Sequence, residues 1–204
     1  MNVTKKATQN TIEHIKKRYH EYRHTENIDE KGSFFSQTCM LICRPTPSYA
    51  ASSRDEIVGY LKDAQQGKVL TEDRLKSSAG PATISKEIKS KRRRGVYTIR
   101  PLQDSEFDFG DETTTAPVGM TPVEMRTKAT DEGWIGMRVD LWDQGGEAGL
   151  LVKVHYWWRC EERPKTQHEP FQSRGGDWMQ CLHDIVYIGP KDGTEGSQCH
   201  ETLE

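Results

Sequence analysis

The chain has 204 residues, which is enough for one domain with a sizeable core and too few to expect two. Its hydrophobic fraction of 33% is low for a compact protein and 29% of its residues are charged, so some segments must contribute little to the core. A formal net charge of −2 argues against a protein-wide attraction to nucleic acid or to an anionic membrane.

Cysteine usage and hydropathy narrow the class of protein further. The five cysteines are widely spaced and form no CxxC pair, so the sequence predicts neither a disulfide framework nor a zinc site. The N-terminus has no apolar targeting segment, and no stretch approaches the length of a membrane span. We therefore predict a cytoplasmic protein with no metal, no cofactor and no membrane partner.

Two amphipathic helices are predicted in the first third of the chain. Residues 4 to about 26 carry apolar side chains at spacings of three and four, namely Ile12, Ile15, Tyr19 and Tyr22. A second helix starts at Ser53, where the serine hydroxyl and the carboxylate of Glu56 form a capping box. The apolar run between the helices, FFSQTCMLICRP, ends at two prolines.

Residues 67–94 look like a polar insertion that ends in a basic run. Six of the nine residues from Lys86 to Arg94 are basic. Since no aromatic residues interleave with them, we interpret the run as a solvated linker and do not predict a nucleic-acid partner. A nuclear-import or phosphate-binding role for Lys89–Arg94 is the alternative, and it would place the protein in the nucleus.

The second half of the chain predicts a meander of strands. A strand begins at Gly95 and meets an edge or bend at Pro101, and residues 111–120 read as a loop. A capping box at Thr121 starts a short helix over 122 to about 132. Three strands follow, at 134–143, 150–162 and 177–189. We therefore expect a single domain over 1–190 and a flexible tail over 191–204.

The first two of these strands can be registered as a hairpin. Placing Asp143 opposite Leu150 pairs apolar side chains at every step of one face and sets Asp140 opposite Lys153 on the other. A slip of one residue would move charged side chains to the apolar face, so this register is preferred.

The third strand is registered by placing Tyr156 opposite Cys181, which sets Lys153 between the carboxylates of Asp140 and Asp184. The apolar face then includes His183. The other face mixes aromatic rings with polar and charged groups: Trp134, Arg138, Asp140, Trp142, Lys153, His155, Trp157, Trp178, Gln180 and Asp184. Four exposed tryptophans would need cover, so we expect either a ligand cavity or a subunit contact there.

This mixed face supplies the candidate catalytic residues. Carboxylates at 140 and 184 are candidate general bases, and His155 is a candidate acid because imidazole titrates near neutrality. A solvated ladder of salt bridges is the alternative interpretation of the same charges. His183 is either a satisfied core histidine or a substrate-binding group.

Three short motifs and the order of the elements resemble the nuclear-transport-factor-2-like (NTF2-like) superfamily, which includes SnoaL-like and scytalone-dehydratase-like proteins. Ser53–Ile57 resembles its G-R-x-x-I helix start, and Gly176–Trp178 resembles the D-G-x-W that opens the last strand. Val154–Trp158 is similar to the penultimate strand of the dehydratases, and the whole is most similar to uncharacterised fungal members. The resemblance covers roughly residues 8–66 and 95–190. It implies an α+β cone, in which a strongly curved mixed or antiparallel sheet wraps around the N-terminal helices.

The resemblance implies a cofactor-free lyase, isomerase or cyclase that acts on a small hydrophobic metabolite of polyketide or terpenoid type, within secondary-metabolite biosynthesis. Asp140, His155 and Asp184 would be catalytic. The substrate-binding residues would be Arg138, Lys153, Trp142, Trp157 and His183. The alternative is a non-catalytic module that binds a small ligand or dimerises through the tryptophan-rich face. In either case we expect a homodimer formed through the sheet.

Overall fold

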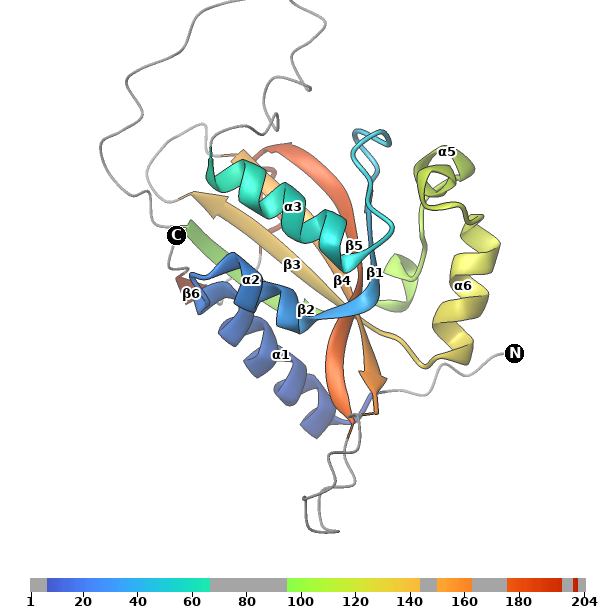
Figure 1. The fold of residues 1–204 in the computed structure, drawn as a ribbon, viewed down its shortest axis with the longest axis horizontal. Helices are drawn as coiled ribbons and strands as arrows, with labels where there is room; N and C mark the ends of the chain where they lie inside the picture. Colours follow the sequence, from blue (N-terminus) through green and yellow to red (C-terminus); the bar gives the residue numbers. More distant parts are fainter. Residues whose placement is uncertain (1–6, 67–94, 144–149, 163–175, 196–199, 202–204) are drawn as a thin grey trace, which may run out of the picture.

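The computed structural model describes residues 7–66, 95–143, 150–162, 176–195 and 200–201 (Figure 1). The predicted insertion at 67–94 lies outside the described residues. Six strands form one sheet in the order β1-β5-β4-β3-β2-β6. The strands are β1 (Phe35–Cys43), β2 (Gly95–Pro101), β3 (Ile135–Asp143), β4 (Leu150–Glu161), β5 (Asp177–Pro190) and β6 (His200–Glu201). β1 runs parallel to β5, and the other neighbours are antiparallel.

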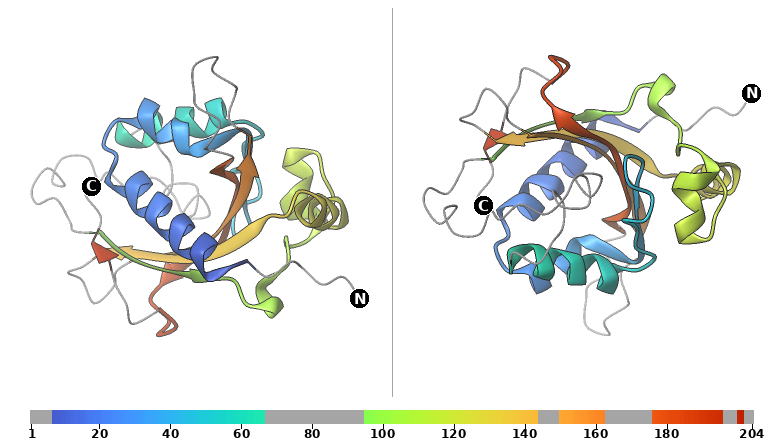
Figure 2. Two further views of the ribbon diagram at one scale, coloured as in Figure 1. Left: turned by 90° about the horizontal axis from the view of Figure 1, so that it is seen from below. Right: turned by 90° about the horizontal axis from the view of Figure 1, so that it is seen from above.

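Three helices fill the concave side of the curved sheet. These are α1 (Gln9–His24), α2 (Ile28–Lys31), which leads into a short 3₁₀ turn at Gly32–Phe34, and α3 (Arg54–Gln65). Figure 2 shows the sheet curving around them. α3 begins at the predicted cap, where Ser53 accepts from the Glu56 amide. α1 begins at Gln9, later than the predicted residue 4, because Thr8 caps it by accepting from the Thr11 amide. The α+β cone with N-terminal helices inside the sheet is confirmed.

The inner, concave face of the sheet carries the larger core. The predicted stripe of α1 is buried against it, and Tyr19 contacts the rings of Tyr97 and Tyr156 at centroid distances of 5.2 and 5.1 Å. Met137, Val139, Val154, Tyr156 and Trp158 supply this face from β3 and β4. The apolar stripe of α1, which repeats about every 3.6 residues, therefore packs on the apolar face of β3 and β4, which repeats every two residues.

The outer, convex face is covered by an excursion between β2 and β3. It contains a 3₁₀ turn at Asp104–Glu106, α5 (Glu112–Thr115), a 3₁₀ turn at Ala116–Val118, and α6 (Pro122–Asp131). In Figures 1 and 2, α6 lies on the side of the sheet opposite α1. The prediction of α6 with its capping box is confirmed, whereas the prediction of a plain loop over 111–120 is wrong because Asp111 caps a helical turn by accepting from the Thr114 amide.

A glycine lets the excursion pack directly on the sheet. The amide of Leu102 donates to the carbonyl of Gly136 at 3.0 Å, and a Cβ on Gly136 would lie 2.3 Å from the Leu102 side chain. A side chain at position 136 would therefore displace the side chain of Leu102 from β3.

The strand register was predicted correctly for one pair and wrongly for the other. Ile135 lies opposite Trp158 and Leu141 opposite Val152, as the β3–β4 prediction required. Tyr156, however, lies opposite His183 and not opposite Cys181. The β4–β5 register shifts at two bulges, between Lys153 and Val154 and between Trp157 and Trp158. A bulge adds an unpaired residue, and strict two-residue alternation cannot anticipate one.

The bulges change which face several side chains occupy. Trp178 packs against the inner core, and Gln180 lies opposite Trp158 on the inner face. Tyr187 lies opposite Lys153 on the outer face, so Asp184 is not the neighbour of Lys153. Asp184 instead lies opposite His155, which keeps these two candidate residues together.

Candidate functional site

The structure offers two candidate sites, one on each face of the sheet. The outer face holds most of the predicted residues: Arg138, Asp140, Trp142, Lys153, His155, Trp157 and Asp184. The side chain of His183 lies on the opposite, inner face because it follows the alternation of β5. One small molecule therefore cannot contact His155 and His183 together.

An arginine anchors Asp184 on the outer face. Asp184 is fully buried, and Arg44 donates to both of its carboxylate oxygens, from Nε at 3.0 Å and from Nη2 at 2.6 Å. Arg44 also donates to the carboxylate of Asp108 at 2.6 Å, which fastens the excursion to the sheet. Burial raises the pKa of Asp184, and the hydrogen bonds from Arg44 oppose that rise.

A second arginine holds Asp140. Arg138 donates to Asp140 from Nε at 2.9 Å and to Glu106 of the excursion at 3.1 Å. Burial raises the pKa of Glu106, but the hydrogen bonds from Arg100, the Gln103 amide and Arg138 outweigh it and lower the pKa to about 2. Asp140 and Glu106 thus share one guanidinium.

Lys153 was predicted to lie between Asp140 and Asp184, and this placement is wrong. Its ammonium forms an ion pair with Asp192 and donates to the Thr194 hydroxyl at 2.7 Å. These partners belong to residues 191–195, which follow β5 and contact Lys153 and Trp142 of the outer face. The cation is therefore engaged by the segment after β5 and not by the two candidate catalytic carboxylates.

His155 is buried on the outer face, and its ring nitrogen Nδ1 has no hydrogen-bond partner within the described residues. Nδ1 lies 4.0 Å from Oδ2 of Asp184, which is too far for a direct hydrogen bond. Burial, together with the charge of Arg44, lowers the pKa of His155 to about 4. The imidazole is therefore neutral at neutral pH and forms no ion pair with Asp184.

The tryptophans of the outer face are covered by the chain itself. Trp157 is fully buried, and its ring contacts Phe107 and Phe109 of the excursion at centroid distances of 5.1 and 4.8 Å. Trp134 belongs to the same cluster. Trp142 is buried near the end of β3, with the Lys191 ammonium 5.0 Å from its ring. The excursion, part of which was predicted as loop, covers Trp134 and Trp157, whereas Lys191 after β5 lies over Trp142.

The inner face carries a polar group within apolar walls. Nε2 of His183 lies 2.6 Å from Oε1 of Gln180, and the rings of Phe35 and Tyr156 lie 5.0 and 4.8 Å from the imidazole. An amide oxygen only accepts, so Nε2 carries the hydrogen and Nδ1 has the lone pair. Burial lowers the pKa of His183 to about 3, which keeps the ring neutral.

Two buried donors next to His183 lack an acceptor. Nε1 of Trp158 and Nε2 of Gln180 have no hydrogen-bond partner among the described residues, and both side chains are fully buried. Trp158 and Gln180 are direct cross-strand partners, so the two donors lie on the same part of the inner face. Sequence reasoning missed this pair, because the bulge beside Trp158 brings Gln180 to the inner face.

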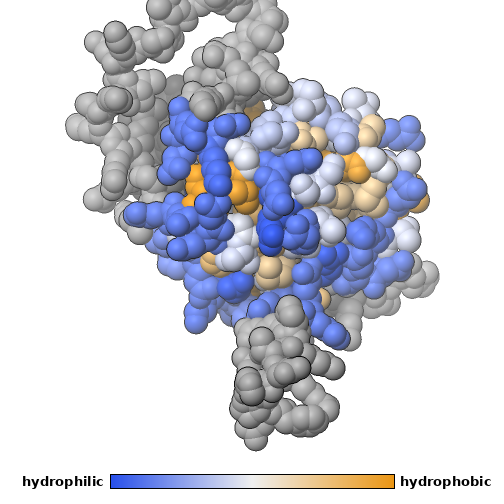
Figure 3. Space-filling model, in the orientation of Figure 1, coloured by the Kyte–Doolittle hydropathy of each residue, from blue (hydrophilic) through white to orange (hydrophobic). Residues whose placement is uncertain are grey.

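Apolar side chains that are only partly buried lie at the edge of the inner core. Partly buried apolar side chains pack against the inner core from α3, β3 and β4; they include Val58, Leu61, Leu141 and Val152. Figure 3 shows an apolar patch beside α3, flanked by hydrophilic surface. The described part of the chain contains no cluster of metal-ligating side chains that could hold an ion and no helix that is long and apolar enough to cross a membrane.

The curved sheet, the enclosed N-terminal helices and the polar groups on an apolar inner face define a cone-shaped α+β protein of the kind that holds small molecules. The sequence model described as SnoaL-like domain matches residues 4–204. The chain therefore belongs to the SnoaL-like family, within the NTF2-like superfamily that its motifs resemble. Neither the curated proteins nor the solved structures contain a match to it.

Proposed function

We propose that this protein takes up a small, largely apolar molecule on the inner face of its cone and converts it by cofactor-free acid–base chemistry, as a lyase, isomerase or cyclase. The observation that carries the proposal is the pair of buried donors on Trp158 and Gln180, which have no acceptor among the described residues. Buried polar groups are nearly always hydrogen-bonded, and an oxygen of a bound ligand would complete this pair.

The inner face has the groups that such chemistry requires. The lone pair on Nδ1 of His183 can accept a proton from a carbon acid if the anion that develops beside it raises the low pKa of the ring, and the donors on Trp158 and Gln180 can stabilise the same oxyanion. The surrounding apolar walls exclude water, which strengthens these interactions. Non-catalytic binding of the same ligand is the alternative, and it uses the same contacts without turnover.

The outer face is the second candidate site, favoured by the buried Nδ1 of His155 beside Asp184. In that proposal Asp140, His155 and Asp184 transfer protons, and Arg138 and Lys153 stabilise the developing charge. Trp142 and Trp157 form its apolar wall. A homodimer, a cytoplasmic location and the nuclear-import alternative stay predictions.

Adjacent tryptophans provide a matched test of the two sites. Trp158 and Trp157 are both fully buried, and both have an Nε1 without a partner in the described part of the chain, but they face opposite sides of the sheet. The protein is incubated with a metabolite extract, the molecule that co-purifies is identified by native mass spectrometry, and its affinity is measured for each Trp→Phe variant. Each variant keeps the aromatic ring and removes only the donor.

The inner-face proposal predicts that Trp158→Phe weakens binding by about threefold to tenfold, the contribution of roughly one hydrogen bond. Trp157→Phe should bind as the unmodified protein does. The reverse pattern would favour the outer face, and failure of both variants to change the affinity would remove both indole donors from the site.

A further inference from the structure

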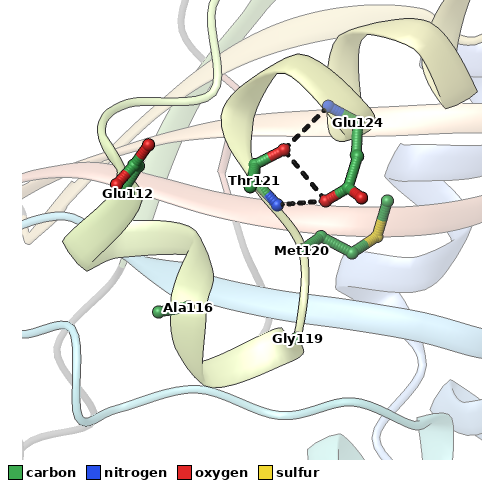
Figure 4. A pocket seen from close by; sticks show the side chains of 6 residues that line it. All are labelled: Glu112, Ala116, Gly119, Met120, Thr121 and Glu124. Atoms are coloured by element: carbon green, nitrogen blue, oxygen red, sulfur yellow. Dashed lines mark hydrogen bonds between the residues drawn. The ribbon is translucent and has the colours of Figure 1, made fainter.

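A cavity of about 310 Å³ lies within the excursion that covers the outer face, between α5, the 3₁₀ turn after it and the first turn of α6 (Figure 4). Its walls are formed by Glu112, Ala116, Gly119, Met120, Thr121 and Glu124. The excursion alone builds this cavity, so it is independent of the proposed inner-face site.

The lining combines an apolar floor with carboxylates on two sides. Figure 4 shows Ala116 and Met120 at the cavity, with Glu112 and Glu124 on opposite sides of it. Glu124 accepts from the Thr121 amide at 2.7 Å and from its hydroxyl at 2.9 Å, and these bonds lower the pKa of Glu124. No ion pair within the described residues neutralises Glu112 or Glu124.

The surroundings share this negative charge and add an exposed apolar side chain. Residues 101–133 contain eight acidic and two basic side chains. Glu106, Asp108 and Glu132 pair with arginines outside this range, which leaves Asp104, Asp111 and Asp131 to add to the charge of Glu112 and Glu124. Val123 is 73% exposed and belongs to the first turn of α6, next in sequence to the lining residue Glu124. Figure 3 shows apolar and hydrophilic surface side by side around α5 and α6. A ligand that matched this surface would be cationic and would extend beyond the cavity.

We propose that this cavity docks a lysine or arginine side chain from a basic segment of a partner protein. The aliphatic stem would lie on Ala116 and Met120, and the cationic head would lie between Glu112 and Glu124. The neighbouring residues of the segment would cover Val123. A free amine would leave Val123 exposed, and for this reason the geometry favours a peptide over a small molecule.

The charge requirement can be tested with the full chain and a fluorescent oligolysine peptide, with oligoglutamate as the peptide control. The double variant Glu112→Gln/Glu124→Gln should weaken oligolysine binding by about threefold to tenfold, as expected for two exposed ion pairs. Glutamine at position 124 can still complete the capping box, so α6 is retained. Glu13→Gln, an exposed carboxylate on α1, is the matched control and should leave the affinity unchanged.

A second variant tests the contribution of the cavity's shape separately from that of its charge. Ala116→Trp would fill the cavity and keep both carboxylates, and it should weaken binding by about tenfold. The proposal is overturned if oligolysine does not bind or if Glu13→Gln weakens binding as much as the double variant does. It is also overturned if Ala116→Trp binds normally, which would indicate a diffuse electrostatic surface, or if lysine amide binds as tightly as the peptide.

Discussion

At the residue scale, the outer face shows how a buried carboxylate is tolerated when an arginine donates to it. Asp184 has no exposed surface, and the guanidinium of Arg44 bonds both of its oxygens. A carboxylate buried in this way is costly without its partner, since removing one member of a buried pair leaves the other uncompensated. Asp108, the other partner of Arg44, is 43% exposed and contributes much less.

Arg44→Met should therefore lower the free energy of unfolding by about 3–5 kcal/mol, as measured by urea denaturation. Replacing the partner as well, in Arg44→Met/Asp184→Leu, should recover a large part of the loss because no buried charge remains. Equal losses in the single and double variants would show that Arg44 acts through its packing or through Asp108, and not through Asp184.

Also at the residue scale, the sequence predicted which polar groups gather but not how they are paired. His155 and Asp184 do lie opposite each other on one face, with Asp140 on the same face. The arginine that binds Asp184 comes from the end of β1, far away in sequence, and Asp192 replaces the predicted partners of Lys153. Long-range partners of this kind leave no periodic signal in the strands themselves.

At the scale of elements, the excursion between β2 and β3 decides the role of the tryptophan-rich face. Phe109 is buried and lies 4.8 Å from Trp157 and 6.4 Å from Trp134, by ring centroids. Because these contacts cover the indoles, the excursion acts as a second layer of the core. The sequence predicted α6 from its capping box, but α5 and the turn after it have no comparable apolar period.

Phe109→Ala should lower the free energy of unfolding by about 3–5 kcal/mol, because it removes a large ring from a packed cluster. Val123→Ala, on the exposed surface of α6, is the control and should change it by no more than about 0.5 kcal/mol. Urea denaturation followed by tryptophan fluorescence measures both. A loss of less than about 1 kcal/mol for Phe109→Ala would contradict the role of the excursion as part of the core.

The strand registers mark a second limit of prediction at this scale. Apolar and polar side chains alternate without interruption along β3 and β4, and this alternation predicts their register correctly. A shift of one residue would have placed charged side chains on the apolar face. The β4–β5 pair contains two bulges, and each moves the following side chains to the other face. For this reason the predicted face is wrong for Trp178 and Gln180, and Gln180 is one member of the unpaired donor pair of the inner face in the described part of the chain.

At the scale of the whole molecule, the order of the elements was enough to predict the cone and its family. The order did not determine which face of the sheet lies inside. Both faces carry apolar side chains: the inner face receives α1 and α3, while the outer face receives the excursion. Which face becomes the concave one depends on the curvature of the sheet and on long-range packing. The candidate site on the inner face could therefore be recognised only in the three-dimensional structure.

The most direct test of the inner-face site is a nitrogen-15 NMR titration that follows the indole N–H signals of the tryptophans while the co-purified ligand is added. The Trp→Phe variants assign the signals of Trp157 and Trp158. If the ligand binds on the inner face, the Trp158 signal should shift because its Nε1 gains an acceptor, and the Trp157 signal should stay in place. A shift of the Trp157 signal with Trp158 unchanged would contradict the inner-face site.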